Sequence, residues 1–237
     1  NIALIFAIGL WFGQVRPPHE DLRGNFKLAI LIPLLTLLLG LDGGLSRGNA
    51  ILLLLLFAVW LGLIVRSATS QLHPGGIDVD LPLRSNALAS IFLGGIGLGA
   101  LIAAGHLYVP GATGITSAFG IDTFVIGASV VAIGTSLPEL VTVILARLRG
   151  HDDIGVGTLI GSNLFNGMAI VGVAATIHPI TFPVLEIAVT VCCGIAALLH
   201  LLTNRSGLIP RERCLPLFSI YGIFLWATLV AGRYRPH

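Results

Sequence analysis

Long apolar segments separated by short charged stretches dominate this chain. A helix needs about 20 mostly apolar residues to cross the hydrocarbon core of a bilayer. Charged residues divide the sequence into eight apolar segments, each predicted to be a membrane span, although the second is short for one. The segments are 2–15, 28–41, 48–65, 86–108, 121–146, 154–185 with a break near His178-Pro179, 187–204 and 214–232. A Pro- and Gly-rich turn is predicted at 109–114. The pattern predicts an all-α polytopic membrane protein with about eight transmembrane helices.

The basic residues between these segments are distributed unevenly. With eight spans, successive loops alternate between the two sides of the membrane, and cytoplasmic loops carry an excess of Lys and Arg. The loops after the first, third, fifth and seventh spans hold ten basic residues and the other side holds three, so we predict that both chain ends face outward. The ten are Arg16, Arg23, Lys27, Arg66, Arg84, Arg147, Arg149, Arg205, Arg211 and Arg213; the three are Arg47, Arg233 and Arg235. We expect a multi-pass protein of the cell (inner) membrane.

The composition agrees with a membrane location. Hydrophobic residues make up 55% of the 237 residues and charged residues 10%, with a mean hydropathy of +0.97. Soluble domains carry about a quarter charged residues, so a disordered chain, a nucleic-acid binder and an ordinary soluble enzyme are excluded. The three cysteines, Cys192, Cys193 and Cys214, are interpreted as packing residues. The chain begins with Asn1 directly before an apolar run, and we expect further sequence upstream.

Glu139 is an acidic residue deep inside a predicted span. A charged carboxylate at the centre of a membrane helix costs about 2.5–3.5 kcal/mol on insertion scales, and such residues are functional by default. Thr135 and Ser136 share its helix face, and Pro138 deprives the Gly134 carbonyl of its helical donor. These oxygen donors suit Na⁺ or Ca²⁺. The alternative is a structural Glu bonded to a neighbouring helix.

A second polar cluster lies in the next span. Thr158, Ser162 and Asn166 recur every four residues and form one stripe, while Gly157 and Gly161 are spaced for close approach of another helix. The short loop 147–153 joins the two spans into an antiparallel hairpin. We therefore expect Glu139 and the stripe to meet near the middle of the membrane.

The two clusters resemble the second α-repeat of the cation/calcium exchanger superfamily, and its prokaryotic sodium/calcium exchanger branch in particular. The resemblance is specific over about 121–179 and rests on two motifs, Gly134-Thr135-Ser136-Leu137-Pro138-Glu139 and Gly161-Ser162-Asn163-Leu164-Phe165-Asn166. That family has ten spans in two inverted halves, each donating one motif pair to a central ion site. The resemblance implies that 1–66 is the remainder of the first half, 67–85 a cytoplasmic linker loop and 86–237 the second half.

The resemblance also implies the ion ligands. Glu139 is the expected main carboxylate ligand of Ca²⁺ and Na⁺, and the remaining expected ligands are Thr135, Ser136, the carbonyl of Ala132, Ser162, Asn166 and Asn1. Asn1 aligns with Asn166 in one register and with Asn163 in another, and small residues in the following turns favour the first. Some family members have Asp where this chain has Asn166. The first repeat's GTSxPE-type segment is absent from these residues.

The implied function is secondary antiport of Ca²⁺ against Na⁺, with H⁺ or an additional K⁺ as alternatives. We expect no enzymatic activity and no cofactor apart from the transported ions, with membrane lipid as a partner and no nucleic acid. Two alternatives come from other classes. One is an intramembrane hydrolase using Ser136, which needs a base positioned beside it. The other is a membrane scaffold that transports nothing. The oligomeric state stays open.

Overall fold

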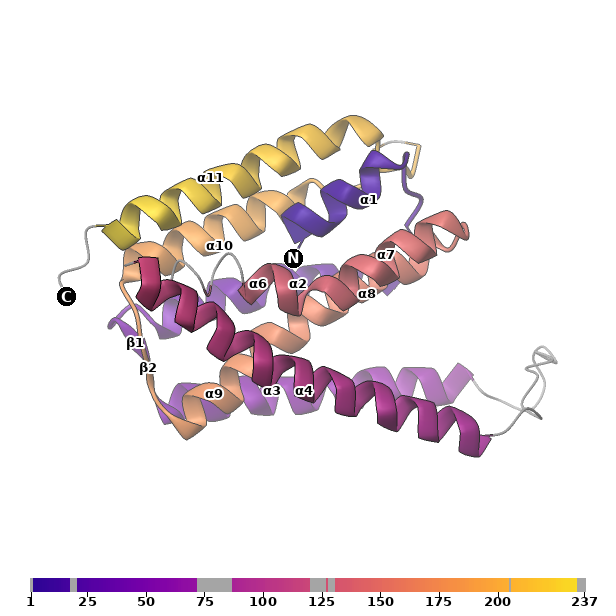
Figure 1. The fold of residues 1–237 in the computed structure, drawn as a ribbon. Coiled ribbons are helices and arrows are strands. Elements are labelled where there is room, and N and C mark those ends of the chain that lie inside the picture. The colour runs from indigo at the N-terminus through magenta and orange to yellow at the C-terminus, as the bar shows by residue number, and fades with distance from the viewer. Residues whose placement is uncertain are drawn as a thin grey trace. The chain divides into compact units, whose positions relative to one another are not determined.

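The computed structural model describes residues 2–17, 21–71, 87–119, 127, 131–204 and 206–233. These residues are mostly helical, which confirms the predicted all-α class (Figure 1). The chain divides into two compact units, and each is described by itself. The first unit comprises Asn1–Val59 and Ser136–His237, and the second comprises Trp60–Thr135.

The helices of the first unit come from both ends of the chain. Before residue 60 lie η1 (Ile2–Phe6), α1 (Ala7–Trp11), α2 (Asp21–Leu39) and the first part of α3 (Arg47–Gln71). After residue 135 lie α7 (Leu137–Leu148), α8 (Asp152–Phe165), η3 (Asn166–Ile170), α9 (Val171–Ile177), α10 (Val184–Leu199), η4 (Arg211–Arg213) and α11 (Cys214–Arg233). Both η1 and η3 are π-helical turns that run directly into an α-helix.

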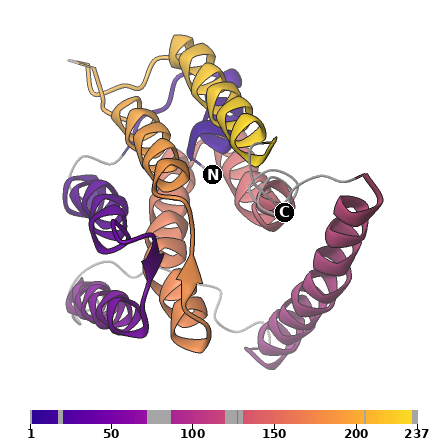
Figure 2. The same cartoon turned by 90° about the vertical axis from the view of Figure 1, so that its left-hand side faces the viewer.

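The continuous segment η1–α1 lies at the centre of this unit. It contacts α7, α8, α10 and α11, and α10 and α11 run side by side next to it (Figure 2). Phe6 and Leu10 are fully buried there. Gly9 admits a close neighbour, because a Cβ added to it would lie 3.0 Å from Val143 Cγ1 of α7. Early and late parts of the sequence therefore share one core.

Short backbone pairings join the first and last parts of the chain on two sides of this unit. Strand β1 (Gly44–Leu45) pairs antiparallel with β2 (Ile180–Thr181), beside a small apolar cluster of Leu45, Ala50 and Ala175. Elsewhere, Val15 and Ile209 exchange backbone hydrogen bonds of 3.0 and 2.8 Å. These pairings satisfy backbone groups in the turns between helices, which water or protein must otherwise bond.

The second unit contains the end of α3, the long helix α4 (Ala87–Phe119) and the single turn α6 (Ala132–Thr135). The predicted turn at 109–114 is wrong, because α4 runs through it with Pro110 inside the helix. A proline removes one helical hydrogen bond, whereas a turn in an apolar environment leaves several backbone groups unbonded. Continuing the helix therefore costs less. Residues 67–71 of the predicted linker continue α3, and 72–85 lie outside the described residues.

The span count agrees with the prediction of about eight. Among the described residues, four helices are long and apolar enough to cross a membrane, and three shorter apolar helices accompany them. The interrupted pair α6 and α7 supplies the remaining segment. The long candidates are Arg47–Ser67, Ile91–Tyr108, Asp152–Ile177 and Arg211–Val230, and the shorter ones are Ile2–Trp11, Gly24–Leu39 and Val184–Leu199.

Candidate ion-binding site

The helix that carries Glu139 starts at a break, as the sequence predicts. α6 ends at Thr135, Ser136 has φ −96° and ψ 2°, and α7 begins at Leu137. Pro138 lies in the first turn of α7 and has no N–H to donate to the Gly134 carbonyl, four residues earlier. The first helical bond of α7 follows it, from the Leu140 N–H to the Ser136 carbonyl at 3.0 Å. Ser136 itself is buried.

The carboxylate of Glu139 lies in the first turn of α7 and is partly buried. Its Oε2 atom is buried and has no hydrogen-bond partner among the described residues. Native proteins pair nearly all such atoms, since an unpaired buried charge is costly. The helix N-terminus favours negative charge there, but a partial dipole does not replace a partner. A bound cation would supply the missing interaction.

α7 and α8 form the predicted antiparallel hairpin and lie side by side (Figure 1). They touch at Gly155, where an added Cβ would lie 3.8 Å from Val143 Cα. A helix rises about 1.5 Å per residue, so Glu139 lies roughly 6 Å and Ser162 roughly 10.5 Å along the hairpin from that contact. Glu139 and Ser162 therefore differ in height by about one turn. Asn166 lies roughly 6 Å further along its helix.

Within the described residues, α7 meets Gly155 and not the two glycines predicted to receive a neighbouring helix. Within the described residues, no atom lies within 4 Å of a Cβ added to Gly157 or Gly161. The buried glycine Gly155 makes the close contact with α7 instead. The small-residue spacing indicates a face on which a helix can pack, but the register of the hairpin decides which glycine meets it.

The stripe residues Ser162 and Asn166 differ in their surroundings. The Ser162 hydroxyl is partly buried and donates to the Leu159 carbonyl at 3.3 Å. Asn166 is exposed and opens the π-helical turn η3, in which its carbonyl accepts the Val171 N–H. Single π turns inside α-helices are frequent at functional sites. The π turn η1 directly follows Asn1, so in the first register it is offset from η3 by one residue.

The remaining candidate ligands lie in the second unit or outside the described residues. The Thr135 hydroxyl donates to the carbonyls of Val131 at 3.0 Å and Ala132 at 3.3 Å. Ala132 and Thr135 thus form one small oxygen-rich turn in α6. Asn1 lies outside the described residues, so its role as a ligand stays a prediction. Ser136 and Glu139 lie at the start of α7 and Ser162 lies on α8, so the three residues belong to the two arms of one hairpin.

The described residues do not bring three or more His, Cys, Asp or Glu side chains together at a potential metal site. Among the predicted ligands, Glu139 is the carboxylate and the others are neutral oxygens. Neutral hydroxyl and amide oxygens with few carboxylates suit hard cations that bind reversibly. Soft metals prefer sulfur and imidazole ligands, which the site lacks within the described residues.

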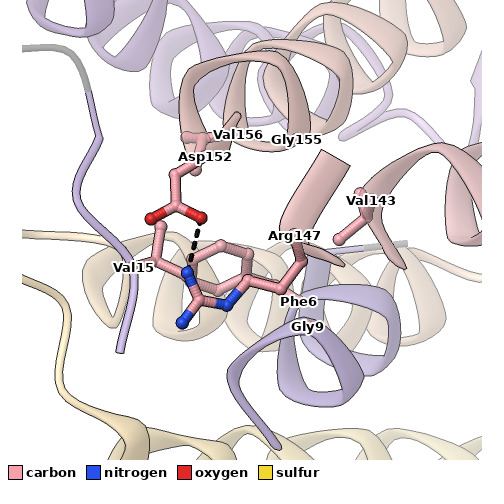
Figure 3. Close-up of a pocket in the computed structure, with 8 residues that line it drawn as sticks. All are labelled: Phe6, Gly9, Val15, Val143, Arg147, Asp152, Gly155 and Val156. Atoms are coloured by element: carbon pink, nitrogen blue, oxygen red, sulfur yellow. Dashed lines mark hydrogen bonds and ion pairs between the residues drawn. The ribbon is translucent and has the colours of Figure 1, made fainter. Parts of the chain in front are cut away.

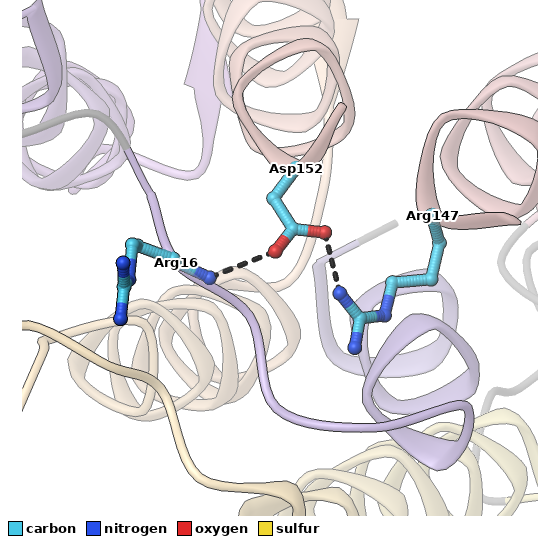
Figure 4. A network of polar contacts seen from close by, with 3 residues as sticks. All are labelled: Arg16, Arg147 and Asp152. Atoms are coloured by element: carbon cyan, nitrogen blue, oxygen red, sulfur yellow. Dashed lines mark hydrogen bonds and ion pairs between the residues drawn. The ribbon is translucent and has the colours of Figure 1, made fainter. Parts of the chain in front are cut away.

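A polar contact that the sequence analysis missed holds the hairpin turn. Asp152, the first residue of α8, accepts from Arg147 Nη1 at 2.6 Å and from the Arg16 backbone N–H at 2.9 Å (Figure 4). The pair borders a pocket whose apolar lining includes Phe6, Val143 and Val156 (Figure 3). The ion pair could have been predicted from the sequence, because Arg147 and Asp152 carry opposite charges on either side of Gly150.

A family-model match covers both motifs. A family model described as "Sodium/calcium exchanger protein" matches residues 89–230. The chain belongs to the sodium/calcium exchanger family. Inner membrane protein YrbG of Escherichia coli is 37% identical over 190 residues, which cover 76% of this chain and 57% of YrbG. Sodium/calcium exchanger MaX1 of Methanosarcina acetivorans is 42% identical over 84 residues, covering 35% of this chain and 24% of MaX1.

The fold agrees with that family. The solved structure of the sodium-calcium exchanger NCX_Mj, soaked with Na⁺ and Sr²⁺, matches with a TM-score of 0.67 and 26% identity. The match covers 94% of this chain and 71% of the NCX_Mj chain. The chain spans a little over half of the length of curated relatives such as YrbG. The exchanger resemblance, the helical membrane fold and the multi-pass inner-membrane location are confirmed.

Proposed function

We propose that this protein is a secondary active antiporter that exchanges Ca²⁺ for Na⁺ across the membrane. The observation that carries the proposal is the buried Oε2 of Glu139 at a helix break, which has no hydrogen-bond partner in the described part of the chain. Because the chain belongs to an exchanger family, we interpret this carboxylate as an ion ligand. Exchangers of this family are transporters, and we propose that this one is not an enzyme and needs no cofactor.

In the proposed mechanism, Glu139 supplies the negative charge that replaces part of an ion's hydration. The hydroxyls of Ser136, Thr135 and Ser162 and the amide of Asn166 supply neutral oxygens, together with the Ala132 carbonyl. Ca²⁺ and Na⁺ compete for these overlapping oxygens, so the carrier is occupied by one kind of ion at a time. An occupied site has its carboxylate neutralised, which lowers the cost of moving it through the low-dielectric interior.

Competition between the ions depends on the charge of the site. A divalent cation gains more than a monovalent one from each carboxylate. Asn166 contributes an amide where some family members have Asp, so this site is less negative by one charge. The amide favours Na⁺ relative to Ca²⁺ and raises the Ca²⁺ concentration needed for half-maximal transport. The apolar side chains exposed on α3 and α4, such as Leu55, Leu88 and Leu107, are proposed to face lipid.

The test is ⁴⁵Ca²⁺ uptake by proteoliposomes that contain the longest natural polypeptide carrying these 237 residues. An outward Na⁺ gradient should drive uptake in the parent protein. Glu139→Gln should abolish it, because the side chain keeps its size and loses only its charge. Glu212→Gln is the control, since Glu212 is exposed in the short turn η4 and lies outside the candidate site.

Gradients of different ions distinguish the coupling. Uptake that needs an H⁺ gradient or external K⁺ would replace Na⁺ in the proposal by that ion. Normal uptake by Glu139→Gln would show that this carboxylate is no ligand. A protein without any ion-driven Ca²⁺ flux, and without thermal stabilisation by Ca²⁺ or Na⁺, would favour the membrane scaffold instead.

A further inference from the structure

Gly134, in the turn α6, has an aromatic ring against its backbone. A Cβ added to Gly134 would lie 2.5 Å from Tyr108 Oη and 2.7 Å from Tyr108 Cε1. Real Cβ atoms do not approach other heavy atoms closer than about 3.0 Å, so no larger residue fits without displacing the ring. Tyr108 belongs to α4, and both residues lie in the second unit.

This contact distinguishes Gly134 from the other described glycines of the second unit. Within the described residues, no atom lies within 4 Å of a Cβ added to any of four glycines of α4, Gly94, Gly95, Gly97 and Gly99. The same holds for Gly105, three residues before Tyr108 on α4. Among the described glycines of the second unit, Gly134 is the one that receives a side chain.

The turn beneath the ring is the one that carries two of the expected ligands. Thr135 follows Gly134 directly, and its hydroxyl is held by the carbonyls of Val131 and Ala132. The Gly134 carbonyl lacks a helical donor because residue 138 is proline. A turn of four residues has few hydrogen bonds to keep its shape. A rigid ring against its backbone supplies the contact that fixes it.

We propose that Tyr108 is a positioning residue for the ion site, an inference that rests on the proposed antiport function. Its ring seats on Gly134 and fixes the turn that presents the Ala132 carbonyl and Thr135. Gly134 is glycine in this motif because the ring occupies the space of its side chain. Tyr108 touches the backbone of the motif and is not itself an ion ligand.

A double-mutant cycle on the longest natural form of the protein tests the inference. Gly134→Ala displaces the ring and should raise the KM for Ca²⁺ on the order of tenfold, since small misplacements of binding groups are costly. Tyr108→Ala should raise the KM for Ca²⁺ less, because the turn α6 then loses a contact but is not displaced by a clash. The double variant should have the KM of Tyr108→Ala alone, since the clash is gone. Gly105→Ala is the matched control and should keep the parent KM.

Thermal unfolding of the same variants, with and without Ca²⁺, separates positioning from bulk stability. A merely structural contact would lower the unfolding temperature and leave KM unchanged, and that result overturns the inference. The inference would also be overturned if the fold-increase in KM of the double variant equals the product of those of the two single variants, because the two residues would then act independently. If the parent shows no Na⁺-driven flux, the proposed function falls. If Glu139→Gln abolishes flux while Gly134→Ala keeps the parent KM, only the role of Tyr108 falls.

Discussion

Asp152→Ala should loosen the first unit by removing one carboxylate that three segments share. Asp152 accepts from the Arg147 guanidinium at 2.6 Å and from the Arg16 N–H at 2.9 Å, so it connects α7, α8 and the segment after α1. The side chains of Arg147 and Asp152 are 19% and 15% exposed. Removing Asp152 leaves the Arg147 guanidinium partly desolvated and without its partner. An unpaired buried charge is the main cost of breaking such an ion pair.

The magnitude follows from these two contacts. A hydrogen bond to a charged group contributes about 1.5–3 kcal/mol net, and ion pairs open to solvent contribute about 0–1 kcal/mol. Because the pair is mostly but not fully buried, we expect Asp152→Ala to lower the free energy of unfolding by about 2–4 kcal/mol. For chains of this length that corresponds to a loss of roughly 5–15 °C in unfolding temperature.

The assay is thermal unfolding in detergent, with Asp153→Ala as the matched control. Asp153 is the next residue in the first turn of α8 and is exposed, so both variants lose the same favourable interaction with the helix N-terminus. The difference between them isolates the contacts to Arg147 and Arg16. Asp152→Asn keeps an acceptor for the Arg16 N–H and should fall between the two. Equal unfolding temperatures for Asp152→Ala and Asp153→Ala would refute the reasoning.

Two further predictions concern the break and the packing of the helices. Pro138→Ala should restore a donor for the Gly134 carbonyl, reduce ion-driven Ca²⁺ uptake and raise thermal stability. The reason is that a helix break kept for binding is maintained at a cost in stability. Uptake equal to that of the parent would show that the Gly134 carbonyl is not part of the site. Gly172→Ala should cost about 1–3 kcal/mol, since its Cβ would lie 2.8 Å from Leu54 Cγ, whereas Gly157→Ala meets no atom within 4 Å in the described residues. Thermal unfolding of that pair is the check, and similar losses would contradict the packing argument.

Features set by local sequence were predictable. Apolar length gave the spans, Pro138 gave the break before α7, and the short loop 147–153 gave the α7–α8 hairpin. Each depends on residues close together in the chain and on one physical constraint, such as a missing N–H or the thickness of the bilayer. The family motifs added the candidate ligands, whose assignment stays a prediction.

Features set by distant partners were not predictable in the same way. The turn expected at 109–114 is a helix because an apolar environment penalises unbonded backbone more than it penalises Pro110. Gly155, and not Gly157 or Gly161, meets α7 because the register of two helices is fixed by their whole interface. Tyr108 and Gly134 are 26 positions apart, and nothing in either local pattern indicates that they touch.

The hydroxyls of the spans show why Glu139 differs from an ordinary polar residue in a membrane helix. Thr142, Thr190 and Thr228 each donate to the carbonyl four residues earlier, at 2.8–2.9 Å. A hydroxyl carries its own proton and so needs no second element. An ionised carboxylate only accepts, and every helical N–H around it after the first turn is already used. A structural Glu139 would need a donor from another side chain, but its buried Oε2 has none within the described residues. A cation from solution meets the same need and can leave again, which is the property that an exchanger requires.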